Sequence, residues 1–244
     1  MKRTLFVIGI LSCLMSLLPA QTDSLLIQST YLSRAIRVYV VDPTPAVREK
    51  PIVYLTDGAK LIEHGSLERI RQLSSDGEIG PAYFVFVSSL DPSDPAIDHR
   101  NEDFFCNPDF LQCFEEELIP AVEASLPVAF EAKDRLLVGV SFGGLNAACF
   151  AAQSRAFHNY ALLSPVCYPR PQVFEAIAFS RNPSLRIFLS TGRHDAEQDV
   201  ENLAALFRRR GDEVRVHVTT GGHDFANWNE QWTVCLKMFL PSEP

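Results

Sequence analysis

Residues 135–144 read RLLVGVSFGG, an apolar run that leads into a Gly-x-Ser-x-Gly turn. In such a turn the serine lies at a sharp reversal from strand to helix, and Gly139 and Gly143 leave room for the two elements to approach. The residues that follow, 142–154, place apolar side chains on one helical face. We therefore expect a nucleophile elbow that presents Ser141. A glycine-rich turn with an ordinary exposed serine is the alternative.

Length and composition favour one large domain with a well-buried core. The chain has 244 residues, of which 47% are hydrophobic and 21% charged. The formal net charge of -8 argues against a nucleic-acid partner, because phosphate binding needs a clustered basic face. The basic run at 208–210 precedes Gly211, where cations complement the negative end of a helix.

The first twenty residues have the pattern of a secretory signal peptide. Two basic residues precede an apolar run from Leu5 to Leu18, and a Pro-Ala pair precedes Gln21. The run is short for a membrane-spanning helix, so we expect cleavage, which leaves a domain at 21–244 that is periplasmic or extracellular without stable membrane association. An uncleaved anchor is the alternative, because Leu18 is less usual than a small residue three before the cut.

Five cysteines remain after the signal peptide, so at least one is unpaired or intermolecular. They are Cys106, Cys113, Cys149, Cys167 and Cys235. Cys106 and Cys113 are close enough in sequence to bridge, although both could be free thiols. We expect Cys149 to pack as a small apolar residue.

Strand and helix patterns alternate along most of the chain. The expected strands are 24–32 and 35–41, which form a hairpin, then 51–58 running into a turn, 82–88, 160–163, 185–190 and 214–219. The expected helices are 60–73, 110–126 capped by Asp109, 142–154, 173–179, 196–209 and 229–240. Continuous apolar strands suit a parallel sheet covered on both faces. We therefore predict an α/β fold with a mainly parallel sheet, antiparallel leading strands and helices on both faces.

Two polar stretches stand out in the sequence, a long loop and a short acidic run. The excursion from Leu90 to Pro108 is long for a loop in a compact domain, which indicates a functional or mobile segment. The acidic run Glu115–Glu117 is interpreted as the solvated face of its helix.

A base and an acid for Ser141 follow later strands. His223 follows the strand at 214–219 and Asp195 follows the strand at 185–190, and ligands bind at such carboxyl ends. The order Ser, Asp, His is that of α/β-hydrolases. We assign His223 as the general base and Asp195 as its orienting acid. Alternatively, His223 is a surface histidine and Asp195 a helix cap.

Other acids could take the place of Asp195. The rivals are Glu197, Asp199 and Asp224. Asp224 would have to fold back onto its neighbour His223, whereas Asp195 lies at the strand end where the fold presents its acid.

An oxyanion hole needs two backbone donors. We expect the amide of Phe142 to be one, and that of Gly58 or Ala59 to be the other, although Asp57-Gly58 is also read as a simple tight turn. The histidines show no metal-ligand spacing, and a third ligand beside His194 and His223 is not evident. We expect neither a metal ion nor an organic cofactor.

With these residues placed, the chain resembles the enterochelin esterase-like branch of the esterase D family of α/β-hydrolases, from about Pro51 to Trp232. The motifs that carry the resemblance are Tyr54–Gly58, His99–Asp103, Asn107–Phe110, Glu117–Pro120, Val138–Gly144, and Gly221–Phe225 with Trp228. It implies a serine esterase with Arg100 and Trp228 as candidate substrate contacts. A salt bridge within the loop is the alternative for Arg100, and packing is the alternative for Trp228.

The resemblance fixes the chemistry better than the substrate. Larger relatives carry an extra amino-terminal domain, so the chain looks like the short, exported members, which differ in substrate. We expect a serine carboxylesterase that forms an acyl-enzyme and acts on a small-molecule or carbohydrate ester, either a siderophore-type lactone or an acyl or feruloyl ester of carbohydrate. An acyltransferase with the same triad and a non-catalytic binding protein of the same fold are the alternatives.

Overall fold

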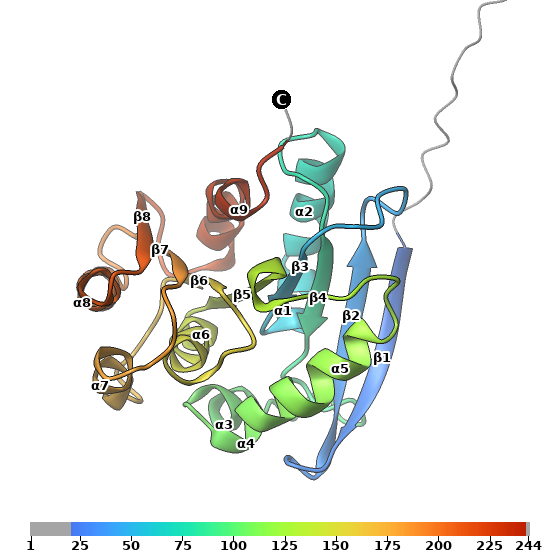
Figure 1. Ribbon diagram of the computed structural model, residues 1–244, viewed down its shortest axis with the longest axis horizontal. Helices are drawn as coiled ribbons and strands as arrows, with labels where there is room; N and C mark the ends of the chain where they lie inside the picture. The colour runs from blue at the N-terminus through green and yellow to red at the C-terminus, as the bar shows by residue number, and fades with distance from the viewer. Residues whose placement is uncertain (1–20, 243–244) are drawn as a thin grey trace, which may run out of the picture.

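Among residues 21–242, which the computed structural model describes, eight strands form one sheet in the order β1-β2-β4-β3-β5-β6-β7-β8 (Figure 1). They are β1 (Gln21–Ser29), β2 (Arg34–Asp42), β3 (Ile52–Leu55), β4 (Tyr83–Val87), β5 (Arg135–Val140), β6 (Asn159–Leu163), β7 (Arg186–Gly192) and β8 (Glu213–Thr219). The pairs β1–β2 and β2–β4 are antiparallel, and the remaining pairs are parallel. The expected sheet is confirmed, while the expected signal peptide lies outside the described residues.

Helices cover both faces of this sheet, as expected (Figure 1). They are α1 (Gly58–Glu63), α2 (Ser66–Ser75), α3 (Arg100–Phe104), α4 (Pro108–Gln112), α5 (Ile119–Glu123), α6 (Phe142–Gln153), α7 (Gln172–Ala178), α8 (Glu197–Arg210) and α9 (Phe225–Phe239). The core on one face contains Leu61, Ile70 and Trp232 of α1, α2 and α9. The core on the other contains Leu145, Ile177 and Leu203 of α6, α7 and α8. Central strands are therefore buried on both sides, which explains their continuous apolar sequences.

Several helix boundaries differ from the prediction. The helix expected at 60–73 is broken into α1 and α2 at Gly65, whose φ of 83° lies in the left-handed region. The expected helix 110–126 begins earlier, as α4, and Asn107 caps it by accepting from the amide of Asp109 at 2.9 Å. It continues through a π-helical segment, Cys113–Leu118, into α5. The last helix begins at Phe225, because Asp224 caps it.

The acidic run is not only a solvated face, because Glu116 is exposed but all three carboxylates accept hydrogen bonds. Glu117 accepts from the amide of Thr30 at 2.8 Å, and Glu116 accepts from the hydroxyl of Tyr31. Glu115 accepts from the hydroxyl of Ser154, just after α6. The three carboxylates therefore fasten the hairpin turn and the end of the elbow helix to the π-helical segment. The sequence interpretation missed these partners, because they lie far away along the chain.

A disulfide joins Cys106 to Cys149 across 43 positions, which corrects both cysteine predictions. It ties the end of the long excursion to α6, so Cys149 is not a free apolar residue. Within the described residues the free thiols are Cys113, Cys167 and Cys235, and all three are buried.

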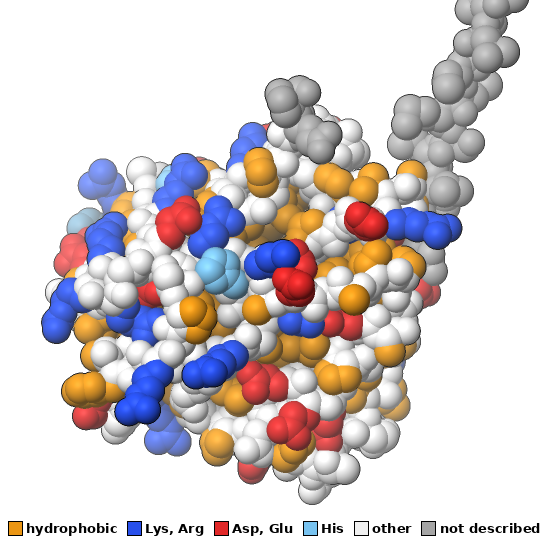
Figure 2. Space-filling view, in the orientation of Figure 1, with side chains coloured by type: hydrophobic (Ala, Val, Ile, Leu, Met, Phe, Trp, Pro, Cys, Tyr) orange, Lys and Arg blue, Asp and Glu red, His pale blue; other side chains and the backbone are white. Residues whose placement is uncertain are grey.

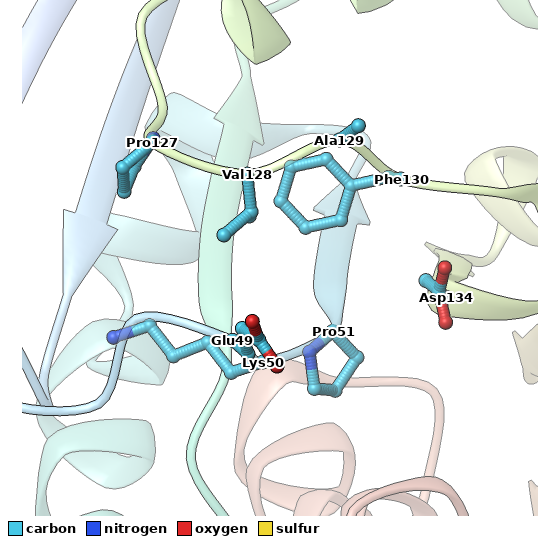
Figure 3. Close-up of a pocket in the computed structure, with 8 residues that line it drawn as sticks. All are labelled: Glu49, Lys50, Pro51, Pro127, Val128, Ala129, Phe130 and Asp134. Carbon is cyan, nitrogen blue, oxygen red and sulfur yellow. The ribbon is translucent and has the colours of Figure 1, made fainter.

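A cavity of about 530 Å³ opens at the amino ends of β3 and β5, between Glu49–Pro51 and Pro127–Phe130 (Figure 3). Lys50 lies in its wall, but the ammonium donates to the carbonyl of Thr44 at 2.7 Å and pairs with Asp42. Open α/β sheets bind ligands at the carboxyl ends of their strands. This cavity lies at the opposite ends, and we do not take it as the active site.

Charged side chains of both signs are mixed over the face seen in Figure 2. Basic side chains are more frequent over α7, α8 and β8 than over β1 and β2, and acidic side chains lie among them. This face therefore presents no continuous basic stripe of the kind that follows a phosphate backbone. None of the helices within residues 21–242 combines the length and apolar character that crossing a membrane requires.

Candidate active site

The elbow is built by a backbone that few side chains tolerate. Ser141 joins β5 to α6 with φ 56° and ψ -116°, an unusual conformation for a residue other than glycine. Its amide donates to the carbonyl of Leu163 at 2.9 Å, which fixes the turn to β6. A Cβ at Gly139 would lie 1.9 Å from the carbonyl oxygen of Gly143. Strand and helix can therefore meet only because glycine occupies position 139.

The three residues predicted to cooperate lie together at the carboxyl ends of β5, β7 and β8. Nε2 of His223 lies 2.8 Å from Oγ of Ser141, and Nδ1 lies 2.6 Å from Oδ1 of Asp195. The Asp195 side chain is 5% exposed, whereas that of His223 is 39% exposed. A neutral ring with its proton on Nδ1 donates to Asp195 and accepts from the Ser141 hydroxyl, which is the arrangement a general base needs.

The rival acids are occupied elsewhere. Glu197 accepts from the amide of His194 at 2.8 Å, and Asp199 accepts from the amide of Cys167 at 2.8 Å. Asp224 accepts from the amide of Asn227 at 2.9 Å as the cap of α9. Of the four carboxylates considered from the sequence, Asp195 is the one that contacts the imidazole.

The turn between β3 and α1 lies against the elbow. The amide of Thr56 donates to the carbonyl of Val138 at 3.1 Å, and a Cβ at Gly143 would lie 2.6 Å from the Thr56 hydroxyl. Gly58 opens α1 and Phe142 opens α6, and the first amides of a helix have no acceptor within it. The amides of Gly58, Ala59 and Phe142 are therefore available as donors on neighbouring turns.

Arg100 makes internal contacts. Its Nε donates to both carboxylate oxygens of Asp57, at 2.7 and 2.9 Å, and its Nη2 donates to the carbonyl of Val140 at 3.2 Å. Burial raises the pKa of the Asp57 carboxyl above its usual range, and the Arg100 guanidinium opposes that rise. These contacts favour a salt bridge over a substrate contact for Arg100, but the partner Asp57 lies in the turn between β3 and α1 and not within the long loop as expected.

Trp228 packs beside the imidazole. The residue is 5% exposed, and its ring meets the ring of His223 edge to face at 5.1 Å between ring centres. Phe225 contacts the same indole at 4.9 Å. These contacts favour the packing interpretation, in which Trp228 supports the orientation of His223.

Sequence reasoning missed an aromatic cluster next to the nucleophile. The ring of Phe142 contacts Phe105 at 4.9 Å and Tyr168 at 6.1 Å. Tyr168 is 76% exposed, so its aromatic ring faces solvent beside Phe142, the residue after Ser141. No local motif marks Phe105 or Tyr168, because they come from the excursion and from the loop after β6. Among residues 21–242, histidine, cysteine and acidic side chains form no group of three suited to a metal ion.

A mainly parallel sheet with an elbow serine at the end of a central strand defines the class of α/β-hydrolases. A family model described as "Putative esterase" matches residues 29–238, and the chain belongs to this family of ester hydrolases. The family and fold expected from the motifs are confirmed.

Two enterobactin esterases are similar to part of this chain. The chain is 29% identical over 122 residues to the iron(III) enterobactin esterase of Escherichia coli (strain K12), covering 49% of this chain and 29% of that protein. The enzyme of the same name from Yersinia enterocolitica is 29% identical over 136 residues, covering 55% of this chain and 37% of that protein. The matched segments thus span well under half the length of these curated relatives.

Solved structures share the fold. Enterobactin esterase from Shigella flexneri has a TM-score of 0.77 at 23% identity, covering 91% of this chain and 58% of that one. A ferulic acid esterase has a TM-score of 0.75 at 18% identity, covering 93% of this chain and 100% of that one.

Proposed function

We propose that the chain is a serine carboxylic-ester hydrolase that uses Ser141 as nucleophile, His223 as general base and Asp195 as orienting acid. The observation that carries the proposal is the unbroken pair of hydrogen bonds in which the Ser141 hydroxyl donates to Nε2 of His223, at 2.8 Å, and Nδ1 of His223 donates to Asp195, at 2.6 Å. A serine hydroxyl is a poor nucleophile at neutral pH and needs such a base within hydrogen-bond reach.

The reaction proceeds in two halves. Oγ of Ser141 attacks the ester carbonyl carbon while its proton passes to Nε2 of His223, and the imidazolium then gives that proton to the departing alcohol. The acyl group remains bound to Ser141. Water, deprotonated by the same imidazole, attacks the acyl-enzyme, and the proton returns to Oγ as the carboxylic acid leaves. Asp195 stabilises the imidazolium in both halves.

Backbone amides stabilise the negative oxygen of each tetrahedral intermediate. We assign this role to the amide of Phe142 and to that of Gly58 or Ala59. The assignment is supported by the contact between the β3–α1 turn and the elbow, through the hydrogen bond from Thr56 to Val138. Removing one such donor typically costs about 100- to 1,000-fold in kcat.

The proposed substrate is a siderophore-type lactone or an acyl or feruloyl ester of carbohydrate. The names of the relatives support this range, since they include enterobactin esterases and a ferulic acid esterase. The exposed ring of Tyr168 beside Phe142 also supports a substrate with a flat, apolar group near the reacting carbonyl. We further propose that the protein is exported, because the disulfide between Cys106 and Cys149 suits an oxidising compartment.

Turnover of p-nitrophenyl acetate by purified variants tests the proposal. Ser141→Ala and His223→Ala should each lose kcat by several orders of magnitude. His194→Ala is the matched control, because His194 is exposed in the Asp195 loop and its imidazole has no role in the proposal. Unchanged turnover in Ser141→Ala would exclude Ser141 as the nucleophile.

A panel of esters then separates the substrate classes. It compares a catecholate lactone, a feruloyl sugar and an acetylated sugar by kcat/KM. Product analysis with and without an acceptor alcohol identifies an acyltransferase if the acyl group moves to the alcohol and free acid does not form.

A further inference from the structure

One guanidinium contacts the two segments that carry the proposed oxyanion donors, the turn before α1 and the elbow. Arg100 pairs with Asp57, the residue immediately before Gly58. It donates to the carbonyl of Val140, the residue immediately before Ser141, at 3.2 Å. Its guanidinium also lies 5.0 Å from the ring centre of Phe142, the residue immediately after Ser141. The two backbone donors proposed for the oxyanion therefore lie on chain segments joined by one side chain.

Most of the Arg100 side chain is buried, and its partner Asp57 is buried almost completely. The Asp57 side chain is 2% exposed and that of Arg100 is 17% exposed. Asp57 has a φ of 59°, a left-handed conformation that a residue other than glycine adopts only when its surroundings hold it there. A planar guanidinium can donate to the carboxylate and to a carbonyl at the same time, whereas an ammonium is a point charge.

We propose that Arg100 is a positioning residue that sets the distance between the two oxyanion donors, and that it does not contact substrate. The inference rests on the proposed serine-esterase function. Arg100 acts through Asp57 on the amides of Gly58 and Ala59, and through Val140 and Phe142 on the elbow. Loss of this link lets the β3–α1 turn move away from the elbow while the hydrogen bonds of the triad stay intact.

Small displacements at this point have large effects on rate. Oxyanion donors act when they lie about 2.7–3.1 Å from the developing negative oxygen. A misplacement of about 1 Å costs about 100-fold in rate. An error in the hole weakens the transition state more than the bound substrate, so the loss falls on kcat and KM changes little.

The test measures kcat and KM for two esters, neutral p-nitrophenyl acetate and anionic mono-p-nitrophenyl succinate. We expect Arg100→Gln to lower kcat by about 30- to 300-fold for both esters, with KM within about threefold. Arg100→Lys keeps the charge without the planar fork and should recover only part of the rate. An increase in KM confined to the anionic ester would overturn the proposal, because it would make Arg100 a substrate contact.

Two control variants separate positioning from general anchoring. Lys60→Gln removes the neighbouring ion pair between Lys60 and Asp98 (2.6 Å), which joins the same turn to the same excursion without reaching the elbow. It should keep kcat within about threefold. Arg34→Gln removes the ion pair between Arg34 and Asp103 that anchors α3 to β2. If Arg34→Gln lowers kcat as much as Arg100→Gln does, loosening of α3 explains the effect and the proposal fails.

A double variant separates the effect of Arg100 on stability from its effect on the catalytic rate. Arg100→Gln leaves Asp57 buried without its partner, which destabilises the protein, and Asp57→Asn/Arg100→Gln removes both charges. We expect the double variant to regain stability and to retain the low kcat. Recovery of both would reduce Arg100 to a stabilising role and overturn the proposal. Ser141→Ala tests the esterase function separately, so a wild-type rate in Arg100→Gln beside an inactive Ser141→Ala would refute the positioning role alone.

Discussion

Removing the disulfide between Cys106 and Cys149 should destabilise the protein by an amount that depends on the length of the loop that the disulfide closes. The two cysteines are 43 positions apart. In the chain-entropy description, a crosslink that closes a loop of this length restricts the unfolded chain by about 4 kcal/mol at 25 °C. Cys149 is also buried in α6, so an alanine there loses packing in addition to the crosslink. Chemical reduction isolates the crosslink from that packing loss.

The assay is urea unfolding of residues 21–244, with and without reductant, for the wild type and for Cys106→Ala/Cys149→Ala. Reduction should lower the free energy of unfolding of the wild type by about 3–4 kcal/mol and leave the double variant unchanged. Titration in denaturant without reductant should find the three free thiols, Cys113, Cys167 and Cys235. Five reactive thiols, or a wild-type stability that does not respond to reductant, would refute the assignment.

Three further predictions follow from the site and the fold. Asp195→Asn should lower kcat by about 1,000- to 10,000-fold, because an amide favours the wrong imidazole tautomer. Asp224→Asn should change kcat little, and similar rates in the two variants would refute the choice of Asp195 as the acid. Gly139→Ala should abolish esterase activity, because the new methyl would lie 1.9 Å from a carbonyl oxygen. Gly77→Ala, with open space around the new methyl, should keep the activity and lose about 1 kcal/mol of stability. Burial raises the pKa of Asp103 to about 6, above its value of about 4 in an unfolded chain, so the folded state holds the proton more tightly. Stability from this group is therefore present below about pH 4 and lost as the pH rises to about 6, by up to about 3 kcal/mol, and Asp103→Asn should flatten that slope in urea unfolding; equal slopes would contradict it.

The sequence predicts the features that depend on local pattern and strand order. The β5 run and the glycines around Ser141 predict a strand–turn–helix, because only small residues allow the close approach seen at Gly139. Asp195 and His223 could be placed because each directly follows a strand, and parallel strands bring their carboxyl ends to one edge of a sheet.

Other features depend on contacts between distant segments, which no local pattern reports. The partners of Glu115–Glu117 lie in the hairpin turn and after α6, so the run is indistinguishable in sequence from an exposed acidic face. Cys106 pairs with Cys149 because the excursion folds over α6, although Cys113 is much nearer in sequence. The pair between Arg100 and Asp57 likewise depends on where the excursion lies, and the sequence left two roles open for the arginine.

Covalent labelling of Ser141 tests the central claim most directly. A fluorophosphonate probe is incubated with the native protein, the modified residue is mapped by mass spectrometry, and ester hydrolysis is measured on the same samples. We predict one label per chain, on Ser141, with activity lost in proportion to labelling and with very slow labelling of His223→Ala. A fully labelled Ser141 in a protein that still hydrolyses esters, or labelling that is as fast in His223→Ala as in the wild type, would contradict the account.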